Sequence, residues 1–588
     1  MLRVFRDRPI TAALAAAVVL SLAGCTSLRD YVHNGFKVGP NYGTPAAPVA
    51  EHWIDAADKR VSQQPADLSR WWEVFKDPKL NWLIACADQQ NLTLREAAFR
   101  ILQARDQLAI ARGDLFPQSQ NATGSYTRRA ASANPPNPAV LPKPWLPPGP
   151  GNLPRLPQVS YSNQWALGFN LAWELDFWGR FRRAVESQED SLEASVADYD
   201  QVLVTLLADV AATYVQIRTD EERIRLLQEN IDIQRKVVIY AEERLRAGTA
   251  KDSINAEQVR SILLQSQAAV EQLRIDQRQA SNRLCVLLGM PPADLERQLG
   301  AGPIPTAPAG VVVGLPAELL SQRPDVRRAQ WLAAAQAEQI GIAQAELYPI
   351  VTINGSLGWQ AKELPYLFSS NAFNGSVGPS FQWNILQYGR LINNVRFQDA
   401  KFQELVVAYQ QTVLTADQEV EDGLVAFLRN QERERLLHES AQASRNAVRV
   451  IGEQQRAGTI DFNQFAVIEQ NLIQQQDQWA QARGDIALGL IAVYRALGGG
   501  WEIRSEPEGS LAVPAPEAPA APPTPEEVQS PPPVPPGPAR KNGAPANNPK
   551  RSAKTWVPRL SIPEPAVKTT SAEAPTKPPE PKPAVPSA

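Results

Sequence analysis

Histidine, cysteine and methionine are scarce in this sequence of 588 residues, and their scarcity narrows the chemistry that it can perform. Only His33, His52 and His438 occur, none of them at the spacing of a metal ligand, and no glycine-rich phosphate loop or nucleophile motif accompanies them. We therefore expect no enzyme, no cofactor and no metal site. Two methionines, one of them the initiator, give no support for a methionine-lined metal path. With a net charge of -3, no nucleic-acid partner is expected either.

The first of the three cysteines stands at the end of a secretory signal. Residues 1–24 carry three arginines, then an apolar run too short for a lasting transmembrane helix, then a small-residue cleavage site directly before Cys25. This order is typical of bacterial lipoproteins, so we predict a covalent lipid, with palmitate, on Cys25; an ordinary free or buried cysteine is the alternative. Thr26 follows instead of aspartate, as in lipoproteins sorted to the outer membrane, where several acyl chains anchor firmly.

The other two cysteines are Cys86 and Cys285. The compartment permits disulfides, but a bridge needs Cα atoms within about 7 Å. The sequence leaves a bridge and two separate thiols both open.

Proline is concentrated at the C-terminal end. Residues 503–588 are rich in Pro, Ala and Lys and have too few apolar side chains to offset the entropy of ordering. We predict a disordered, partly polyproline-II tail. Its scattered basic residues leave open a contact with peptidoglycan, beside the simpler interpretation of a solvated spacer.

Glycine and proline are absent from residues 180–247, which predicts one helix about 100 Å long. Its apolar residues follow spacings of three, four and seven, typical of a coiled-coil seam. A shift of 210 residues places Trp173 on Trp383 and the sequence Arg-Ala-Gly-Thr at 246–249 on its copy at 456–459. The long helix is therefore duplicated, and a cytoskeletal-type coiled coil is the alternative interpretation.

Before each long helix the apolar period changes from about 3.6 to 2. From 160 to 175, aromatic and aliphatic residues alternate with small or polar ones, and 118–128 gives a weaker partner strand. The length suits a tilted membrane-spanning strand, with a soluble sandwich strand as the alternative. We expect an interfacial aromatic girdle, formed by Trp165, Trp173, Trp359 and Trp383.

These elements predict two structural repeats. We also expect the opening helix, capped by Asp77 before Pro78, to run past Asn91 to Ala111, and the second hairpin to contain Trp383 and Ile385 in its last strand. The full division is signal peptide 1–24; lipidated linker 25–77; first repeat 78–294, with hairpin 118–175, long helix 180–247 and return helix 253–288; linker 295–322; second repeat 323–502, with hairpin 350–386, long helix 390–457 and return helix 460–497; and tail 503–588.

Four strands cannot close a barrel, and open strand edges are not tolerated in lipid. Closure must therefore come from oligomerisation, and two, three or four chains would give 8, 12 or 16 strands. The long helices would continue on the periplasmic side as a ring of helices, forming a tunnel.

Several short motifs are weak singly but specific together: Leu22–Cys25, Val38–Tyr42, Trp173–Arg180, the two Arg-Ala-Gly-Thr turns, Leu319–Asp325 and Tyr494–Trp501. With them the chain, over about residues 20–502, resembles the outer-membrane factor family, the TolC-like channel-tunnels of tripartite efflux pumps, in its lipoprotein branch. The resemblance implies an α+β membrane channel-tunnel in which a homotrimer shares a 12-stranded β-barrel and a long periplasmic α-helical barrel.

The resemblance also implies a function and partners. The channel would conduct substrates passively from a periplasmic adaptor (membrane fusion) protein and an inner-membrane RND-type transporter to the exterior of a Gram-negative bacterium. It would be anchored in outer-membrane lipid. A conduit for type I secretion shares the fold and is the alternative; a structural coiled-coil lipoprotein is another, but it leaves the strands unexplained.

Gating and adaptor docking are expected at the periplasmic turns. The resemblance places docking at Arg246, Gly248, Thr249, Arg456, Gly458 and Thr459. The acidic gate positions of the family are occupied here by Gln464 and Val467, so we expect Asp252, Glu257 or Asp461 to take their place. Solvated tip charges without a gating role are the alternative.

Overall fold

The computed structural model describes residues 28–64, 67–131, 160–247, 254–317, 322–456 and 462–505. Contacts divide the chain into two units, Met1–Glu517 and Ala518–Ala588, and every described residue belongs to the first. The predicted signal peptide, Cys25, the proline-rich loop, the first Arg-Ala-Gly-Thr turn from Gly248 onward, the second from Ala457 onward, and the tail after Ser505 lie outside these residues.

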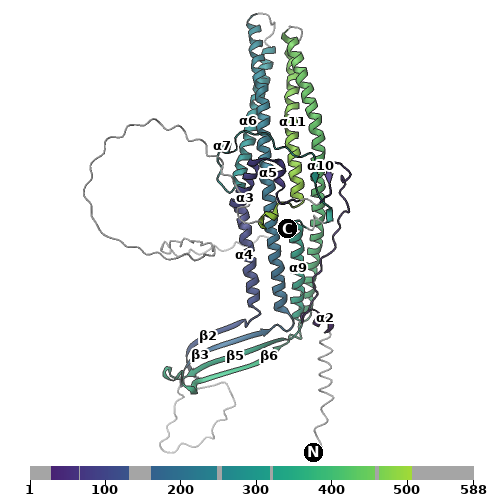
Figure 1. The fold of residues 1–588 in the computed structure, drawn as a ribbon. Coiled ribbons are helices and arrows are strands. Elements are labelled where there is room, and N and C mark those ends of the chain that lie inside the picture. The colour runs from purple at the N-terminus through teal and green to yellow at the C-terminus, as the bar shows by residue number, and fades with distance from the viewer. Residues whose placement is uncertain are drawn as a thin grey trace, which may run out of the picture. The chain divides into compact units, whose positions relative to one another are not determined.

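Four helices run side by side through the upper part of Figure 1. The two longest, α5 (Arg180–Arg246) and α10 (Arg390–Arg456), have 67 residues each, and the return helices are α6 (Ile254–Leu287) and α11 (Phe462–Ala496). Gly179 begins α5 with a φ of 83°, a left-handed conformation that glycine adopts without strain. The predicted duplication of the long helix is thus present at equal length.

Shorter helices flank the half of the long helices nearer the sheet. They are α3 (Pro78–Gln90), α4 (Leu92–Gly113) and α9 (Pro324–Ala345). Asp77 caps α3 as predicted, accepting hydrogen bonds from the backbone N–H groups of Lys79 and Leu80.

The prediction of one helix running past Asn91 is wrong. Asn91 has extended backbone angles, and its side chain accepts a hydrogen bond from the Leu94 N–H while donating one to the Leu287 carbonyl, both at 2.8 Å. Asparagine competes with the helix by bonding nearby backbone in this way, so one helix ends and the next begins there.

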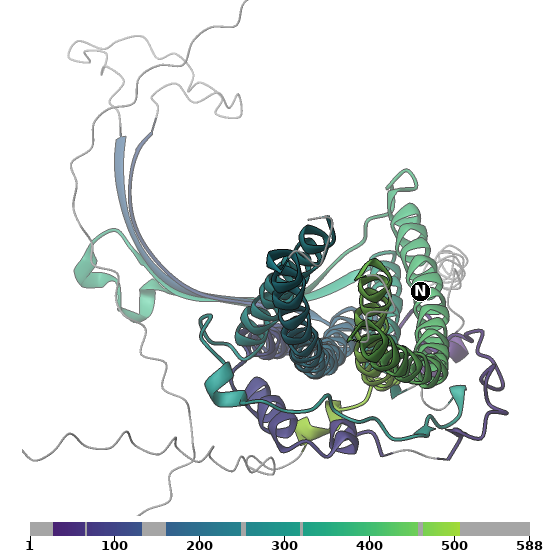
Figure 2. The same cartoon turned by 90° about the horizontal axis from the view of Figure 1, so that it is seen from above.

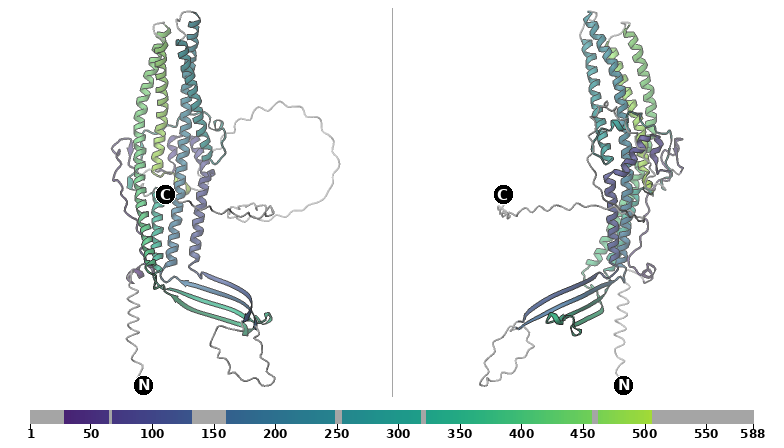
Figure 3. Two further views of the ribbon diagram at one scale, coloured as in Figure 1. Left: turned by 180° about the vertical axis from the view of Figure 1, so that it is seen from behind. Right: turned by 60° about the vertical axis from the view of Figure 1, so that its left-hand side comes forward.

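A four-stranded antiparallel sheet lies at one end of the helices, the end away from the turns that join α5 to α6 and α10 to α11 (Figures 1 and 3). Its strands are β2 (Ser119–Ala131), β3 (Ser160–Leu175), β5 (Ile350–Ala361) and β6 (Phe373–Gln382), in the spatial order β2-β3-β5-β6, with short turns η2 (Leu364–Tyr366) and η3 (Ser370–Ala372) before β6. Seen from above, the sheet curves into an arc (Figure 2).

The prediction that Trp383 and Ile385 lie in the last strand is wrong, because β6 ends at Gln382. Gln382 pairs with Ile350, the first residue of β5. The residue before Ile350 is Pro349, which has no N–H group to continue the hydrogen bonds between the two strands. β3, by contrast, lies between two strands and extends to Leu175.

The segments expected to be linkers contain short helices and strands, of which α2 lies where the sheet meets the helices and the others lie around the middle of the helices. Residues 28–77 contain α2 (Leu28–His33), β1 (Val61–Ser62) and η1 (Trp71–Phe75), and β1 pairs in parallel with β4 (Val311–Val312) from the second linker, which also contains α7 (Glu296–Leu299). The last element, η4 (Trp501–Ser505), extends beyond the predicted start of the tail at 503. Periodicity does not reveal such elements because their stability comes from tertiary packing.

The largest hydrophobic core of the described residues lies around the middle of the helices. Trp71, Trp72 and Leu80 are almost fully buried there, and the Trp71 ring stacks on Tyr494 with centroids 5.6 Å apart. Cys86 and Cys285 are both free thiols, which resolves the open question of a bridge.

One helix among the described residues, α5, contains a window apolar enough to cross a membrane by length and composition. In this structure 72% of that window is buried, and α5 as a whole packs against helices α3, α4, α6, α9 and α11. Packing between helices therefore accounts for its apolar character.

Candidate functional site

One face of the sheet carries large apolar side chains that are exposed in the single chain. Val377 is 81% exposed and Phe381 75%. The other members of this face, each at least 38% exposed, are Tyr126, Tyr161, Leu167, Phe169, Leu357 and Phe373. The register places them in adjacent rows, since Phe169 pairs with Leu357 and Tyr126 with Trp165. Apolar groups on this scale normally require a partner or a membrane.

The opposite face is polar. Asn170 lies between Asn121 and Ser356 in the register, and Ser356 is opposite Ser376, with their hydroxyl oxygens 2.8 Å apart. Thr352 and Ser380 make a similar hydroxyl pair at 2.7 Å. Strands that alternate between apolar and polar faces in this way form the walls of membrane barrels, with water on the polar side.

Both edges of the sheet lack a strand partner among the described residues. β2 pairs only with β3, and β6 pairs only with β5. Unpaired edges of this kind recruit strands from other chains.

The four predicted girdle tryptophans lie at the two ends of the sheet. Trp165 and Trp359 are at the end far from the helices, where the Trp165 ring lies 4.6 Å from Tyr126 and the Trp359 ring 5.8 Å from Phe373. Trp173 and Trp383 are at the helical end. There each indole donates a hydrogen bond to a backbone carbonyl, Trp173 to Leu115 at 3.3 Å and Trp383 to Leu347 at 3.0 Å.

The segment after the predicted lipid site is fastened where the sheet meets the helices. The Tyr31 hydroxyl in α2 donates to the Phe177 carbonyl at 2.7 Å, and the Val38 N–H donates to the Trp178 carbonyl at 3.0 Å. Arg183, which is 1% exposed, donates to the carbonyls of Val38 and Gly39.

Arg183 is also paired across two helices. Its guanidinium contacts a carboxylate oxygen of Glu338 in α9 at 2.5 Å, and Glu338 is itself buried. A buried guanidinium requires such a partner. Nothing in the local sequence predicts this pair, because its members are 155 residues apart.

Some of the residues predicted for the docking and gate site at the tip lie within the described part of the chain, and the others lie outside it. Arg246 ends α5 and is exposed, with its guanidinium 3.4 Å from Glu242 one turn earlier. Glu257 is exposed in the first turn of α6, and Gln464 and Val467 are exposed at the start of α11. Arg456 ends α10, but its side chain lies outside the described atoms. Gly248, Thr249, Asp252, Gly458, Thr459 and Asp461 lie outside the described residues.

Two polar side chains are buried near this tip. Glu469 in α11 is 3% exposed and Gln234 in α5 is 2% exposed. Neither the Glu469 Oε1 atom nor the Gln234 amide has a hydrogen-bond partner in the described part of the chain. Burial raises the pKa of Glu469 to about 7. Among the described residues near the tip, Glu469 is therefore the most deeply buried carboxyl group, and it is not one of the predicted gate positions.

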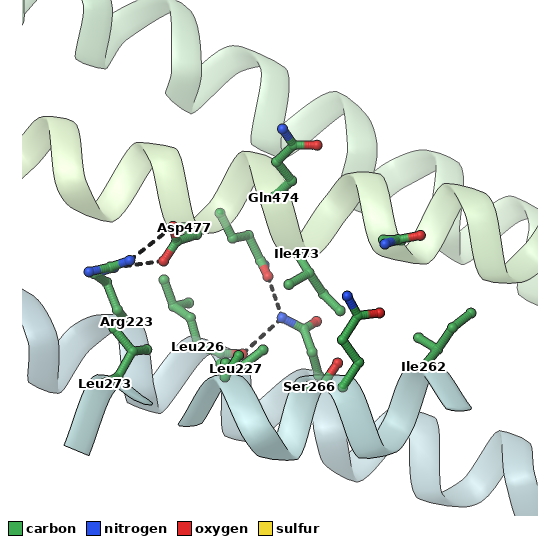
Figure 4. A pocket seen from close by; sticks show the side chains of 14 residues that line it. Arg223, Leu226, Leu227, Ile262, Ser266, Leu273, Ile473, Gln474 and Asp477 are labelled. Atoms are coloured by element: carbon green, nitrogen blue, oxygen red, sulfur yellow. Dashed lines mark hydrogen bonds and ion pairs between the residues drawn. The ribbon is translucent and has the colours of Figure 1, made fainter. Parts of the chain in front are cut away.

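A cavity of about 370 Å³ lies between α5, α6 and α11, further from the tip (Figure 4). Across it, Arg223 donates to both carboxylate oxygens of Asp477, at 2.7 and 3.2 Å. The Asn230 amide donates to Gln476 at 2.7 Å. These contacts link the first pair of long helices to the second.

The sequence and the fold are similar to those of known proteins. The family profile described as "Outer membrane efflux protein" matches residues 83–290 and 315–499. The chain is 28% identical over 492 residues to the probable efflux pump outer membrane protein TtgC of Pseudomonas putida, an alignment that covers 82% of this chain and 96% of that protein. It is 26% identical over 487 residues to nodulation protein T of Rhizobium leguminosarum bv. viciae, covering 81% and 90%.

The fold is similar to that of solved outer-membrane channels. The outer-membrane channel OprN matches with a TM-score of 0.71 and 30% identity, covering 79% of this chain and 99% of that one. The CmeC outer membrane channel of Campylobacter jejuni matches with a TM-score of 0.71 and 22% identity, covering 79% and 95%.

Proposed function

The chain belongs to the outer membrane efflux protein family, and we propose that three copies of it form the channel of a tripartite efflux pump. The observation that carries this proposal is the sheet, which has one apolar exposed face, one polar face and two edges that pair with no other strand in the described part of the chain. Three copies would supply twelve strands, enough to enclose an aqueous lumen, whereas eight strands are filled by side chains. The polar face would line that lumen and the apolar face would contact lipid.

The helices then form the periplasmic part of the conduit. The helices that adjoin the strands in the chain, α4, α5, α9 and α10, all leave the sheet on one side, so a closed ring of sheets would continue as a ring of helices. Transport through such a conduit is passive, because the chain offers a path and no energy source. Substrate choice would rest with the inner-membrane transporter.

The partners follow from the same role. The relative TtgC is named as the outer membrane protein of an efflux pump, and such a channel needs a periplasmic adaptor and an inner-membrane transporter of the RND type to receive substrates. We place adaptor docking at Arg246, Gly248 and Thr249 and at their copies Arg456, Gly458 and Thr459. The gate would lie beside them, among Asp252, Glu257, Asp461, Gln464 and Val467.

Anchoring would come from lipid on Cys25. Helix α2 begins at Leu28, three residues later, and is held by the Tyr31 hydrogen bond where the sheet meets the helices. This position lies at the periplasmic face of the proposed barrel, where acyl chains on Cys25 would reach the inner leaflet of the outer membrane.

The test is complementation of a Gram-negative strain that lacks its own channel but retains an adaptor and a transporter that work with this chain. We expect the full-length chain to restore resistance to exported toxic compounds and to lower their accumulation. A correctly inserted chain that changes neither quantity, with partners shown to bind it, would contradict the proposal.

A further inference from the structure

Trp178 and Tyr348 join the two repeats within one chain. Their rings are stacked, with centroids 4.5 Å apart and planes at 23°. The Trp178 indole also donates to the Pro349 carbonyl at 2.8 Å. The contact ties the turn between β3 and α5 to the turn between α9 and β5.

Each of these two aromatic residues has an equivalent in the other repeat. The shift of 210 residues that relates the long helices places Trp178 on Tyr388, and the shift of 232 residues that relates the opening helices places Tyr348-Pro349 on Phe116-Pro117. Tyr388 is 97% exposed and Phe116 is 68% exposed. One aromatic pair is therefore joined in the structure, and its counterpart is separated and exposed.

The counterpart cannot form within one chain. Phe116 precedes β2 and Tyr388 follows β6, and these strands are the two opposite edges of the sheet.

The backbone around Tyr388 also differs from that around Trp178. β6 ends at Gln382, whereas the equivalent strand β3 continues to Leu175, and Tyr388 has a left-handed φ of 48°, unusual for a residue with a side chain.

We propose that Tyr388 stacks on Phe116 of the partner subunit, a second copy of this chain, as Trp178 stacks on Tyr348 within one chain. This inference rests on the proposed oligomeric channel and specifies how its copies join. Aromatic pairs favour offset stacking at such separations, and both rings are exposed in the single chain. The geometry of the intrachain pair supplies the arrangement, because the repeats place the same elements around it.

The same relation fixes the strand register between copies. The shift of 210 residues that relates β3 to β6 places Ala172 on Gln382. Ala172 pairs with Ser119 and Gln382 pairs with Ile350, so Ser119 is equivalent to Ile350, and β2 is related to β5 by a shift of 231 residues. Within the chain, Leu171 is opposite Gly355. Transferred to the edges, this pair becomes Phe381 opposite Gly124 of the partner subunit, with both residues on the apolar face.

Exposed side chains on α10 and α4 would extend the proposed contact between copies from the sheet to the helices. Phe397 in α10 is 56% exposed, and Phe99 and Leu102 in α4 are each 47% exposed. Within the chain, the position equivalent to Phe397 is Ser187, whose hydroxyl donates to the Ala335 carbonyl of α9. By the same relation α10 would pack against α4 of the partner subunit, and Phe397 would be covered there.

Thiol crosslinking in the full-length, membrane-inserted protein tests the proposal. We expect the double variant Phe116→Cys with Tyr388→Cys, treated with a short thiol-to-thiol crosslinker, to give species of two and three chain masses. Each single variant controls for the native cysteines and should stay at one chain mass. Trp178→Cys with Tyr348→Cys should crosslink within one chain, which shows that the reagent spans this geometry. Tyr348→Cys with Tyr388→Cys should not crosslink.

A second pair keeps the proposal testable if the aromatic replacements impair folding. Phe381→Cys with Gly124→Cys should form an interchain disulfide, whereas Phe381→Cys with Ser125→Cys, shifted by one residue to the other face, should not. Oligomers that conduct ions but give no interchain product from either pair, or that prefer Ser125, would overturn the proposed contact and leave the channel standing. Chains that never associate would overturn both.

Discussion

Trp173 and Trp383, which stand 210 residues apart in the sequence, make the same hydrogen bond at equivalent places in the two repeats. The Trp173 indole donates to the Leu115 carbonyl and the Trp383 indole to the Leu347 carbonyl. Both carbonyls lie in the turn between an opening helix and its first strand. Each tryptophan therefore ties the end of one hairpin to its beginning, where sheet and helices meet.

Replacing Trp173 by phenylalanine should keep the apolar ring but leave the Leu115 carbonyl without this donor. We expect a loss of about 1 kcal/mol of stability, the usual net value of one such hydrogen bond. The thermal unfolding midpoint of the purified protein measures it. Trp359→Phe, which alters ring contacts with Phe368 and Phe373 but neither of the two hydrogen bonds, is the matched control. Equal midpoints for Trp173→Phe and wild type would contradict this role.

The two faces of the sheet can be tested with adjacent residues. Phe169 lies on the apolar face and Asn170 on the polar face of β3. A lysine facing lipid at mid-membrane depth costs about 2–4 kcal/mol, whereas one facing the lumen is hydrated. We therefore expect Phe169→Lys to reduce the amount of protein assembled in the outer membrane and Asn170→Lys to leave it unchanged. Equal yields, measured in membrane fractions, would argue against a lipid-facing apolar surface.

Glu469 predicts a pH dependence near the tip. Burial raises its pKa from the ordinary 4.5 to about 7, so between these values the folded protein holds a proton that the unfolded chain has lost. Stability should fall as pH rises through this window, by on the order of 3 kcal/mol, and change no further above it. Glu469→Gln should remove this dependence and raise the unfolding midpoint at pH 8 but not at pH 4.

The control for that measurement is Glu453→Gln, at an exposed glutamate in α10. It should change the midpoint little at either pH. A Glu469→Gln variant with the wild-type pH profile would show that the buried carboxyl does not control stability.

Gly39 holds the N-terminal segment against α9. Its φ is 95°, and a Cβ atom there would lie 2.4 Å from the Cα of Gly341. Neither atom belongs to a flexible side chain, so Gly39→Ala should displace the segment and the Gly39 carbonyl that Arg183 binds. We expect faster proteolysis of residues 28–64. Gly43→Ala, where a Cβ would meet nothing within 4 Å, is the control. Identical digestion patterns for the two variants would contradict this account.

The proposed tip is tested at Gly248 and Gly458. Each follows the end of a long helix, where a glycine commonly adopts a left-handed conformation that a branched residue resists. Valine at either position should abolish efflux in the complementation strain without lowering the yield of the trimer. Undiminished efflux would mean that docking and gating lie elsewhere.

Much of the fold was predictable from the sequence because its signals are long and repeated. The absence of glycine and proline between Arg180 and Arg246 predicted the first long helix, and the motifs that recur 210 residues later predicted the second. Alternation from 160 to 175 predicted β3.

The features that sequence reasoning missed depend on non-local contacts. Asn91 breaks a helix because the Leu287 carbonyl, 196 residues away, accepts its amide hydrogen bond. β6 ends before Trp383 because its neighbour β5 begins after a proline. Arg223 and Asp477 meet across 254 residues, and no local pattern reports such a pair. The gate and docking residues remain predictions for a related reason, since their chemistry is set by partner proteins.

Copies of this chain, as we propose, enclose a water-filled path across the outer membrane. Conductance of the purified oligomer in a planar lipid bilayer tests this path most directly. We predict discrete conductance steps from oligomers of three chain masses, with none from Phe169→Lys preparations that fail to assemble. A stable, membrane-inserted oligomer that never conducts ions would contradict the claim.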